Sequence, residues 1–379
     1  MSLQLTDEQK SMVETVRDFA ARECGTREKR LELTNDGKTH HNAEIARKLA
    51  DLGFLGLSIP EGYGGAGGGL FDACLLVEEL AYNQVPVGSF AVTLIVSHIY
   101  LNAASEDLKR EILGAVVAGT PTAVAMSEPG SGSDVASLRC KAEKVDGGYR
   151  LNGQKTWISN AHYSDHILLV ARTADTGDKH QGISMISVPT SAPGVEIRPI
   201  PTMGAEINDV FFTDCEVGQE RLVGVEGQGW LQLIAGLNTE RVIVGALPLG
   251  QARRAFEDTL NYVKTREQFG RPVGTFQALS HRLAELATEL ECTRLLVHDV
   301  ARRVDENPGK LMPKEAFIVK PTATELAKHA ALEGIQMMGG MGYAVEGGME
   351  EQFRTAAMGT IAGGSSEIQR DIIAKTLGL

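Results

Sequence analysis

Hydrophobic residues along the chain change their spacing twice. Up to about residue 120 they recur at helical intervals, as in 45–55 and 70–82. From about residue 122 apolar and polar positions alternate, which predicts strands, and after Gly229 the helical spacing returns. Because helices and strands are segregated rather than alternating, the pattern predicts an α+β fold. We expect three domains, which cover residues 1–121, 122–228 and 229–379.

The same pattern predicts individual elements. The first helix should begin after Thr6, because Thr6 and Gln9 have the spacing of a capping box. The alternating region should contain a hairpin and four further strands, at 137–145, 149–159, 167–172, 182–188, 195–200 and 209–212. Later helices are expected at about 230–265, 275–305, 312–337 and from 366.

One acidic residue interrupts an apolar helix face. Glu240 has the helical spacing of four hydrophobic neighbours, Leu233, Leu237, Val244 and Leu247. A carboxylate among hydrocarbon side chains is costly unless it is paired, and burial raises its pKa toward that of a general base. Two interpretations follow. Glu240 either forms a structural ion pair, with Arg241 or with a distant cation, or acts as a catalytic base.

Composition argues against several classes of partner. The net charge is −12 and the isoelectric point is about 5.3, so we expect no electrostatic binding to nucleic acid or to anionic membranes. No uncharged apolar stretch has the length of about 18 residues that a membrane span needs. The N-terminus has the pattern of a helix rather than of a targeting peptide, and the five cysteines form no CxxC pair. Both features predict a cytoplasmic protein with reduced thiols. The nine histidines lack metal-ligand spacing, so no metal site is expected.

Segments rich in glycine and hydroxyl groups are the candidates for ligand binding. The run 62–67 matches GxGxxG, but it follows Pro60 and Glu61 rather than a strand, so we interpret it as a surface loop and not as a dinucleotide site. Four other segments offer backbone N–H groups, small hydroxyls or a flat indole to a planar or anionic ligand: 127–134, 155–159, 336–343 and 363–367. An ordinary loop is the alternative for each.

These four segments, in this order, resemble the acyl-CoA dehydrogenase family over essentially the whole chain. The resemblance also covers residues 5–9, 59–65, 153–154, 266–270 and 365–370. It implies an N-terminal helical domain, a middle antiparallel β domain and a C-terminal four-helix bundle, assembled as a homotetramer with one FAD per subunit. The implied substrate is an acyl-CoA, and the implied electron acceptor is electron-transfer flavoprotein.

The resemblance also implies which residues bind the FAD and the substrate. The flavin would be lined by Val124, Ala125, Met126, Ser127, Gly132 and Ser133, and it would pack against Trp157, Ile158 and Ser159. The pyrophosphate and adenosine would be bound, partly across a subunit interface, by Arg266, Phe269, Gln277, Gln336, Met337, Gly339 and Gly340. The family's Thr-Ser-Glu stretch is matched by Ser365, Ser366 and Glu367. The substrate would contact Ser133, Arg241 and Gly364.

The chain departs from many family members at Gly363. They carry the catalytic glutamate at this position, whereas this sequence reads Ile361-Ala362-Gly363-Gly364. The isovaleryl-CoA and long-chain subgroups instead place their base on the first long helix after the β domain, and their Glu-Arg pair matches Glu240-Arg241. The continuation Pro248-Leu249-Gly250 is most similar to the isovaleryl type. The resemblance therefore favours Glu240 as the base.

On this interpretation Glu240 removes the α-proton of an acyl thioester while the β-hydrogen leaves as hydride to flavin N5. The developing enolate needs positioned hydrogen-bond donors, and the backbone N–H of Gly363 would still supply one. The small residues Ala362 and Gly363 favour a branched, terpenoid-like or long acyl group over a straight four-carbon chain. The segment Ser89–Leu101 is expected to line the acyl end.

Other functions stay open at this point. A nitroalkane oxidase or a flavin-dependent monooxygenase of the same fold would not need Glu240 at this position. A non-catalytic subunit of a heteromeric dehydrogenase would lack the base or part of the flavin site, and a purely structural helical protein would hold no flavin. Glu351 and Thr355 also depart from the family, which usually has Arg and Asp there, so different packing is expected around Phe353-Arg354.

Overall fold

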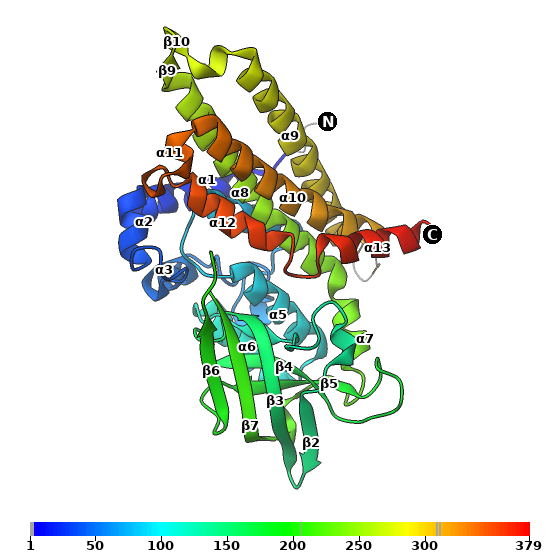
Figure 1. The fold of residues 1–379 in the computed structure, drawn as a ribbon. Coiled ribbons are helices and arrows are strands. Elements are labelled where there is room, and N and C mark those ends of the chain that lie inside the picture. The colour runs from blue at the N-terminus through cyan, green and yellow to red at the C-terminus, as the bar shows by residue number, and fades with distance from the viewer. Residues whose placement is uncertain (1–3, 205, 308–309, 311) are drawn as a thin grey trace.

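The computed structural model describes residues 4–204, 206–307, 310 and 312–379, without the side chains of residues 237–240. Figure 1 shows a helical N-terminal region, a β domain and a set of long C-terminal helices that extend away from the β domain. The expected order of helical, β and helical regions is confirmed.

The N-terminal region is helical. It contains α1 (Asp7–Cys24), α2 (Arg27–Leu33), α3 (Ala43–Asp51), α4 (Leu70–Tyr82), α5 (Phe90–Ala103) and α6 (Glu106–Val117). The capping box is confirmed, because Oγ1 of Thr6 accepts from the backbone N–H of Gln9 at 3.2 Å and Oε1 of Gln9 accepts from that of Thr6 at 3.1 Å. The run 62–67 lies in the connection between α3 and α4 and includes part of a short 3₁₀ turn, in agreement with its interpretation as a loop.

The described residues of the central region form an eight-stranded sheet. Its strands are β1 (Ala123–Ala125), β2 (Lys141–Val145), β3 (Gly148–Ser159), β4 (His166–Arg172), β5 (Ile183–Pro189), β6 (Val195–Ile200), β7 (Ile207–Gly218) and β8 (Leu222–Val223). The strand order is β6-β7-β3-β2-β4-β5-β8, with β1 beside β4, and the pairs are antiparallel except for β1 and β2 with β4. The expected hairpin is β2–β3, but its first arm begins at Lys141 because residues 135–137 form a 3₁₀ turn.

The C-terminal region is helical again. It contains α7 (Gly229–Ala235), α8 (Leu237–Thr265), α9 (Gln277–Glu306), α10 (Pro313–Met338), α11 (Gly340–Tyr343), α12 (Met349–Gly359) and α13 (Ser366–Thr376), with a small hairpin, β9 (Glu267–Gln268) and β10 (Arg271–Pro272), between α8 and α9. The single helix expected over about 230–265 is wrong, since it divides at Gly236. Leu233 therefore lies on α7, whereas Glu240 lies on α8. Gly236 keeps a near-helical backbone (φ −85°, ψ −6°), which is why the hydrophobic spacing continues across the break.

Neither a membrane span nor a disulfide is found among the described residues. None of the described helices has the length and apolar character that crossing a bilayer requires. The five cysteines are free thiols, and of these Cys292 is exposed and the others are buried. Burial raises the pKa of Cys24 and of Cys140 to about 11, so both thiols are protonated at neutral pH.

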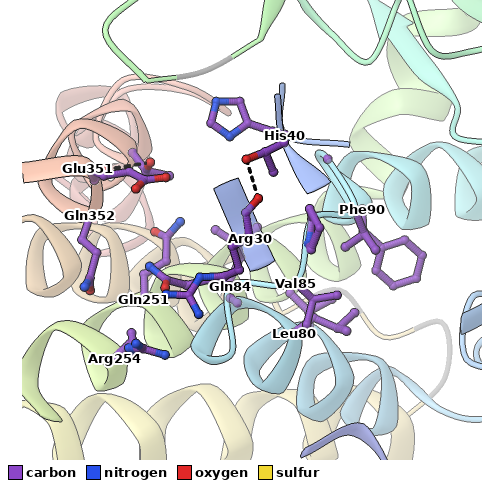
Figure 2. A pocket seen from close by; sticks show the side chains of 18 of the residues that line it. Arg30, His40, Leu80, Gln84, Val85, Phe90, Gln251, Arg254, Glu351 and Gln352 are labelled. Atoms are coloured by element: carbon purple, nitrogen blue, oxygen red, sulfur yellow. Dashed lines mark hydrogen bonds between the residues drawn. The ribbon is translucent and has the colours of Figure 1, made fainter. Parts of the chain in front are cut away.

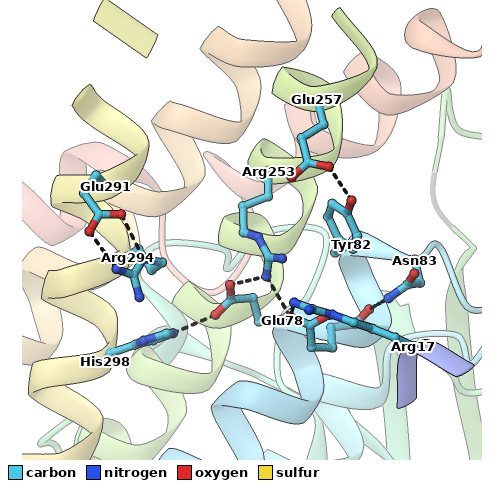
Figure 3. Close-up of polar contacts among 10 residues, drawn as sticks. Arg17, Glu78, Tyr82, Asn83, Arg253, Glu257, Glu291, Arg294 and His298 are labelled. Atoms are coloured by element: carbon cyan, nitrogen blue, oxygen red, sulfur yellow. Dashed lines mark hydrogen bonds and ion pairs between the residues drawn. The ribbon is translucent and has the colours of Figure 1, made fainter. Parts of the chain in front are cut away.

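A buried ionic network joins α1, α4, α8 and α9 (Figure 3). Glu78 on α4 is only 3% exposed, and its carboxylate lies 2.5 Å from Nη1 of Arg253 on α8 and 2.7 Å from Nε2 of His298 on α9. Arg253 also contacts Glu79 at 3.0 Å, and Arg17 on α1 contacts Glu79 at 2.8 Å. Burial alone would raise the pKa of Glu78, but His298 and Arg253 outweigh burial and lower it. The network therefore fixes the middle of α8 against the N-terminal helices.

Replacing Arg253 by Met should destabilise the protein by about 3–5 kcal/mol, because Glu78 would stay buried without its guanidinium partner. Arg150→Met is the control: it removes an exposed ion pair with Glu216 and should cost less than about 1 kcal/mol. Urea unfolding of both variants at pH 7 measures the difference, and equal stability would contradict the prediction.

The folded pKa of Glu78 lies below the unfolded value of about 4.3. The ionised carboxylate of Glu78 therefore contributes fully to the free energy of unfolding above that pH. This contribution should be lost on further acidification.

Candidate active site

A cavity of about 570 Å³ lies where the three regions meet. The N-terminal region contributes Ile95, His98 and Ile99 of α5, which belong to the segment Ser89–Leu101 that we expect to line the acyl end. The other walls come from β1 and the loop after it, from α7 and the start of α8, from α10, and from the turn before α13. The lining is mostly apolar and includes Val124, Met126, Val135, Leu138, Val170, Trp230, Leu233, Ile234, Pro313, Phe317, Ile368 and Ile372.

Strand β1 presents alternate side chains to the cavity. Val124 and the following Met126 line it, whereas Ala125 points to the other face and is buried in the core of the β domain. Of the residues expected to line a flavin, Ala125 can therefore contribute only its backbone. The loop after β1 adds Ser127, Gly132 and Ser133 to the cavity wall.

A buried ion pair holds this loop against β3. Lys155 on β3 is fully buried, and its Nζ donates to the carboxylate of Glu128 and to the backbone oxygen of Met126, both at 2.8 Å. The carboxylate also accepts from the backbone N–H groups of Arg139 at 2.7 Å and Cys140 at 2.8 Å. Burial would raise the pKa of Glu128, but Lys155 and the two N–H groups outweigh burial and lower it. The ionised carboxylate thus accepts three hydrogen bonds, and Lys155 adds a fourth contact to the loop through the carbonyl of Met126.

Trp157 is carried outward by a bulge in β3. The pairing of β3 with β7 shifts register between Lys155 and Ile158, and Trp157 has a φ of +63°. Its indole is 59% exposed, although so large an apolar group is usually covered. Ile158 is instead buried in the core of the β domain, and its carbonyl accepts from Asn208 at 2.9 Å. Its side chain therefore does not share the surface of Trp157, while Ser159 at the end of β3 is half-buried.

The turn at Gly363–Gly364 forms another wall of the cavity. Both glycines have left-handed backbones, with φ of +61° and +77°. Nε2 of Gln369 on α13 donates to both carbonyl oxygens, at 3.0 and 3.1 Å, and Nζ of Lys320 on α10 donates to that of Gly364 at 2.8 Å. The left-handed backbone of Gly364 favours glycine, and a Cβ there would also displace the amide of Gln369, whose Nε2 would lie 2.8 Å away.

Helix α8 reaches the cavity at its N-terminal end. Arg241 is buried and lines the cavity, with its guanidinium 5.2 Å from the ring centre of Phe317. Its Nη2 is 3.8 Å from the place of a Cβ on Gly364, and Cγ1 of Val244 is 3.8 Å from the place of a Cβ on Gly363. The backbone of Glu240 belongs to the same helix, but its side chain lies outside the described residues.

The residues expected to bind the pyrophosphate and adenosine lie elsewhere. Arg266, Phe269 and Gln277 flank the β9–β10 hairpin, which Figure 1 shows at the far end of the long helices from the β domain. Phe269 is 93% exposed. The second group, Gln336, Met337, Gly339 and Gly340, lies where α10 meets α11; there Met337 is buried in the bundle core, and a Cβ on either glycine would meet nothing within 4 Å. A single chain thus does not bring the hairpin residues to Trp157.

The remaining predicted residues begin α13. Ser365 caps this helix, because its Oγ accepts from the backbone N–H of Ile368 at 3.4 Å. The hydroxyl of Ser366 is buried and has no hydrogen-bond partner within the part of the chain that the structure describes. Glu367 is exposed, and backbone and Ser365 hydrogen bonds lower its pKa.

Comparison with known proteins agrees with this architecture. Family models of the N-terminal, middle and C-terminal domains of acyl-CoA dehydrogenases match residues 6–120, 123–215 and 227–378. This chain belongs to the acyl-CoA dehydrogenase family.

Similar proteins cover nearly all of the chain. The mitochondrial 2-methylacyl-CoA dehydrogenase of Solanum tuberosum is 34% identical over 99% of this chain and 92% of that protein. The mitochondrial isovaleryl-CoA dehydrogenase of Arabidopsis thaliana is 33% identical with the same coverage. The crystal structure of an acyl-CoA dehydrogenase from Geobacillus kaustophilus has a TM-score of 0.93 at 32% identity, and the FAD complex of PigA has a TM-score of 0.90 at 28% identity, both with full coverage of the two chains.

The cofactor of this acyl-CoA dehydrogenase is FAD, and its residues fit that group. The outward indole of Trp157 offers a flat surface to a planar ring system. The anchored loop that ends at Ser133 offers backbone N–H groups and hydroxyls beside it. The hydroxyl of Ser366, two residues after the lining residue Gly364, is buried and has no partner among the described residues. When bound, FAD would supply the acceptor for a hydride from the substrate.

Several site residues of this dehydrogenase were not predicted. Trp230 and Phe317 line the cavity, but nothing in their local sequence marks them, and His98 was expected only as part of the segment Ser89–Leu101. Burial lowers the pKa of His98, which keeps the imidazole neutral at pH 7. Lys320 does have a sequence signal: like Glu240, it is a charge next to apolar residues of a helix, here 316–319.

A second cavity, of about 190 Å³, lies between the N-terminal and C-terminal regions of the enzyme (Figure 2). Its lining includes Glu351 and Thr355, two of the positions at which the sequence departs from its family. Two of its arginines already have partners, since Arg254 contacts Asp258 at 2.7 Å and Arg30 donates to a backbone carbonyl at 3.1 Å. We interpret this cavity as a packing space at the domain junction rather than as a ligand site.

Lys155→Met should weaken FAD binding through the loop that Lys155 anchors, and not through a contact of its own with the cofactor. Glu128 would stay buried without its cation, so the loop that it anchors should lose its fixed position, and the Kd for FAD should rise by about tenfold or more. Lys141→Met, on an exposed position of β2, is the matched control and should change the Kd by less than about twofold. Flavin fluorescence during titration of deflavinated protein measures both. Equal FAD affinity in the two variants would show that the loop does not depend on the ion pair.

Proposed function

We propose that this acyl-CoA dehydrogenase oxidises a branched or bulky acyl-CoA to the trans-2-enoyl-CoA, with Glu240 as the base that removes the α-proton. The observation that supports this role is the meeting of α8 with the turn at Gly363–Gly364. Val244 and Arg241 both approach the turn within 3.8 Å of where glycine Cβ atoms would be. Glu240 is one helical turn before Val244 in α8, and the spacing of four residues predicts that the two share a helix face.

The chemistry of the α-proton sets what the chain must supply. A thioester α-proton is weakly acidic, so its removal needs a carboxylate in position and hydrogen-bond donors at the carbonyl oxygen, where negative charge develops. Glu240 would be the carboxylate, and the backbone N–H of Gly363 would be one donor. The apolar walls of the cavity exclude water when an acyl chain fills it, which strengthens both interactions.

Gly363 bears on the choice of substrate. A side chain at φ +61° would be strained, and the space beside Gly363 is open as far as Val244, at 3.8 Å from the place of a Cβ. A branch close to the thioester would therefore have room at this wall. The wall of α5, with Ile95 and Ile99, extends the apolar space toward the rest of the acyl chain. The names of the two plant relatives, which refer to 2-methylacyl-CoA and isovaleryl-CoA, support a branched acyl group.

The separation of the predicted FAD residues supports an oligomer. Trp157 and the β9–β10 hairpin lie at opposite ends of one chain (Figure 1), so a single FAD would reach both groups only if the hairpin came from another subunit. We propose a homotetramer in which Arg266, Phe269 and Gln277 contact the FAD of a neighbouring subunit. Electron-transfer flavoprotein is the proposed acceptor of the electrons.

Glu240→Gln should keep its FAD but lose the reaction. A positioned general base contributes about 10²–10⁴-fold to the rate, so bleaching of the flavin absorbance under anaerobic titration with isovaleryl-, octanoyl- or palmitoyl-CoA should become about that much slower. Glu14→Gln, at an exposed position of α1, is the control and should bleach at the wild-type rate.

Two outcomes would overturn this proposal. Bleaching of the Glu240→Gln variant at the rate of the control would show that another group removes the proton. If none of the three thioesters bleached the wild-type flavin and O₂ reoxidised the reduced enzyme rapidly, a nitroalkane oxidase or a flavin-dependent monooxygenase would be favoured instead.

A further inference from the structure

Lys320 is a fully buried cation on α10. No carboxylate of the described residues lies within ion-pair distance of its ammonium group, which instead donates to the backbone oxygen of Gly364 at 2.8 Å. Its neighbours on the same helix, Val319 and Ala323, are also fully buried. Burying an ammonium group is costly, and an apolar residue of similar size would often give equal or better stability. The position of Lys320 therefore calls for an explanation other than packing.

The hydrogen bonds of Lys320 and Gln369 fix the turn at Gly363–Gly364. Gln369 donates to the carbonyl oxygens of both glycines, and Lys320 to that of the second. In a trans peptide the C=O and N–H groups point in opposite directions. Because both carbonyls are held toward these two side chains, the N–H groups of the same peptides, those of Gly364 and Ser365, are held away from them. The N–H of Gly363 belongs to the preceding peptide, which adjoins the first of these two at the Cα of Gly363. The hydrogen bonds from Lys320 and Gln369 thus set the orientation of these two peptide groups in the cavity wall.

Lys320 also adds positive charge beneath the turn. Nη2 of Arg241 on α8 lies 3.8 Å from the place of a Cβ on Gly364, so two cations flank this residue. Burial, followed by repulsion from Arg241, lowers the pKa of Lys320 to about 8. Glu325 on the same helix and Glu367 on α13 raise the pKa of Lys320, but by less. Gln369 is neutral. The side chain of Glu240 lies outside the described residues.

We propose that Lys320 is a positioning residue for the dehydrogenation. Its ammonium group holds the Gly363–Gly364 turn in the orientation that receives the thioester oxygen, and its charge stabilises the negative charge that develops there when the α-proton is removed. This inference rests on the proposed function of the same cavity. It assigns to Lys320 no contact with the substrate, since the effect passes through the turn and through the electric field of the buried charge.

With the charge of Lys320 in place, the site should stabilise the enolate more than the neutral thioester. A buried charge acts more strongly on a developing charge than on an uncharged ligand, because little water screens it. Loss of Lys320 should therefore lower kcat more than it raises KM. It should also weaken binding of acetoacetyl-CoA, which readily forms an enolate, more than binding of the 2-enoyl-CoA product, which carries no such charge.

The experiment compares Lys320→Met with Lys328→Met, an exposed lysine on the same helix. We expect Lys320→Met to keep its FAD, to lose about tenfold or more in kcat, and to bind acetoacetyl-CoA about tenfold or more weakly, with product affinity changed by less than about threefold. Lys328→Met should match the wild type in each measurement. Wild-type values of kcat and of both affinities for Lys320→Met would overturn the inference.

A pH profile separates the charge of Lys320 from its hydrogen bond. Because the cationic form is required and its pKa is about 8, wild-type kcat should decline as the pH rises through that value. Lys320→Arg keeps the cation at every accessible pH, so its alkaline decline should move upward by about one pH unit or more. Gln369→Leu removes the other donor and should lower kcat by about tenfold while leaving the alkaline decline in place. Identical alkaline profiles for the wild type and Lys320→Arg would contradict the role of the charge.

Failure of this inference differs from failure of the proposed function. If no acyl-CoA bleaches the wild-type flavin, both fall together. If the wild type and Glu240→Gln behave as proposed while Lys320→Met equals the wild type, only the role of Lys320 is wrong. Should Lys320→Met lose its FAD, Lys320→Arg and Gln369→Leu still decide the question through the pH profile.

Discussion

Helix α8 packs against two other helices at distances that only glycine permits. A Cβ on Gly245 would lie 2.4 Å from the side chain of Val319 on α10, and a Cβ on Gly250 would lie 2.2 Å from the backbone oxygen of Glu78 on α4. Three residues after Gly250, Arg253 joins the buried ionic network with Glu78. Close packing on both sides and a buried ion pair leave α8 little freedom to slide or rotate. Its N-terminal end is therefore fixed relative to the turn at Gly363–Gly364, where the proposed reaction takes place.

The buried lysines Lys155 and Lys320 differ in how their charge is balanced. Lys155 and Glu128 neutralise each other and anchor the loop after β1, so this pair is satisfied inside the protein. Lys320 has a backbone carbonyl as its partner, and its charge is not cancelled by a neighbouring carboxylate of the described residues. A neutral pair mainly gives rigidity, whereas an uncompensated charge also acts on whatever binds nearby. This difference is why Lys320, rather than Lys155, is assigned a role in the reaction.

The sequence predicted the larger features of the fold because local patterns determine them. The spacing of Thr6 and Gln9 predicted the first helix start, the alternation at 195–200 predicted β6 at the residues where it is found, and the segregation of helices and strands predicted the domain order. The break at Gly236 was missed because its backbone is nearly helical and leaves the hydrophobic spacing intact.

The candidate site was only partly predictable, because it depends on contacts between distant segments. Motifs marked Ser127–Ser133 and Gly363–Gly364, but no local pattern shows that the residues between them fold so that both segments line one cavity. The outward direction of Trp157 comes from a bulge whose register shift is set by pairing with β7. The separation of Arg266 from Trp157 within one chain also follows from the length of α8 and from its direction relative to the sheet. The spacing predicted where this helix ends, but it predicted neither its start at Leu237 nor its direction.

The identity of the base is the central claim, and proton exchange tests it most directly. Holoenzyme is incubated anaerobically in D₂O with the acyl-CoA that bleaches the wild-type flavin most strongly, and deuterium at the α-carbon of the thioester is followed by NMR. Because the reaction is reversible, the wild type should incorporate deuterium at this carbon, whereas Glu240→Gln with its FAD bound should incorporate none above the rate without enzyme. Incorporation by Glu240→Gln at the wild-type rate would contradict the assignment of Glu240 as the base.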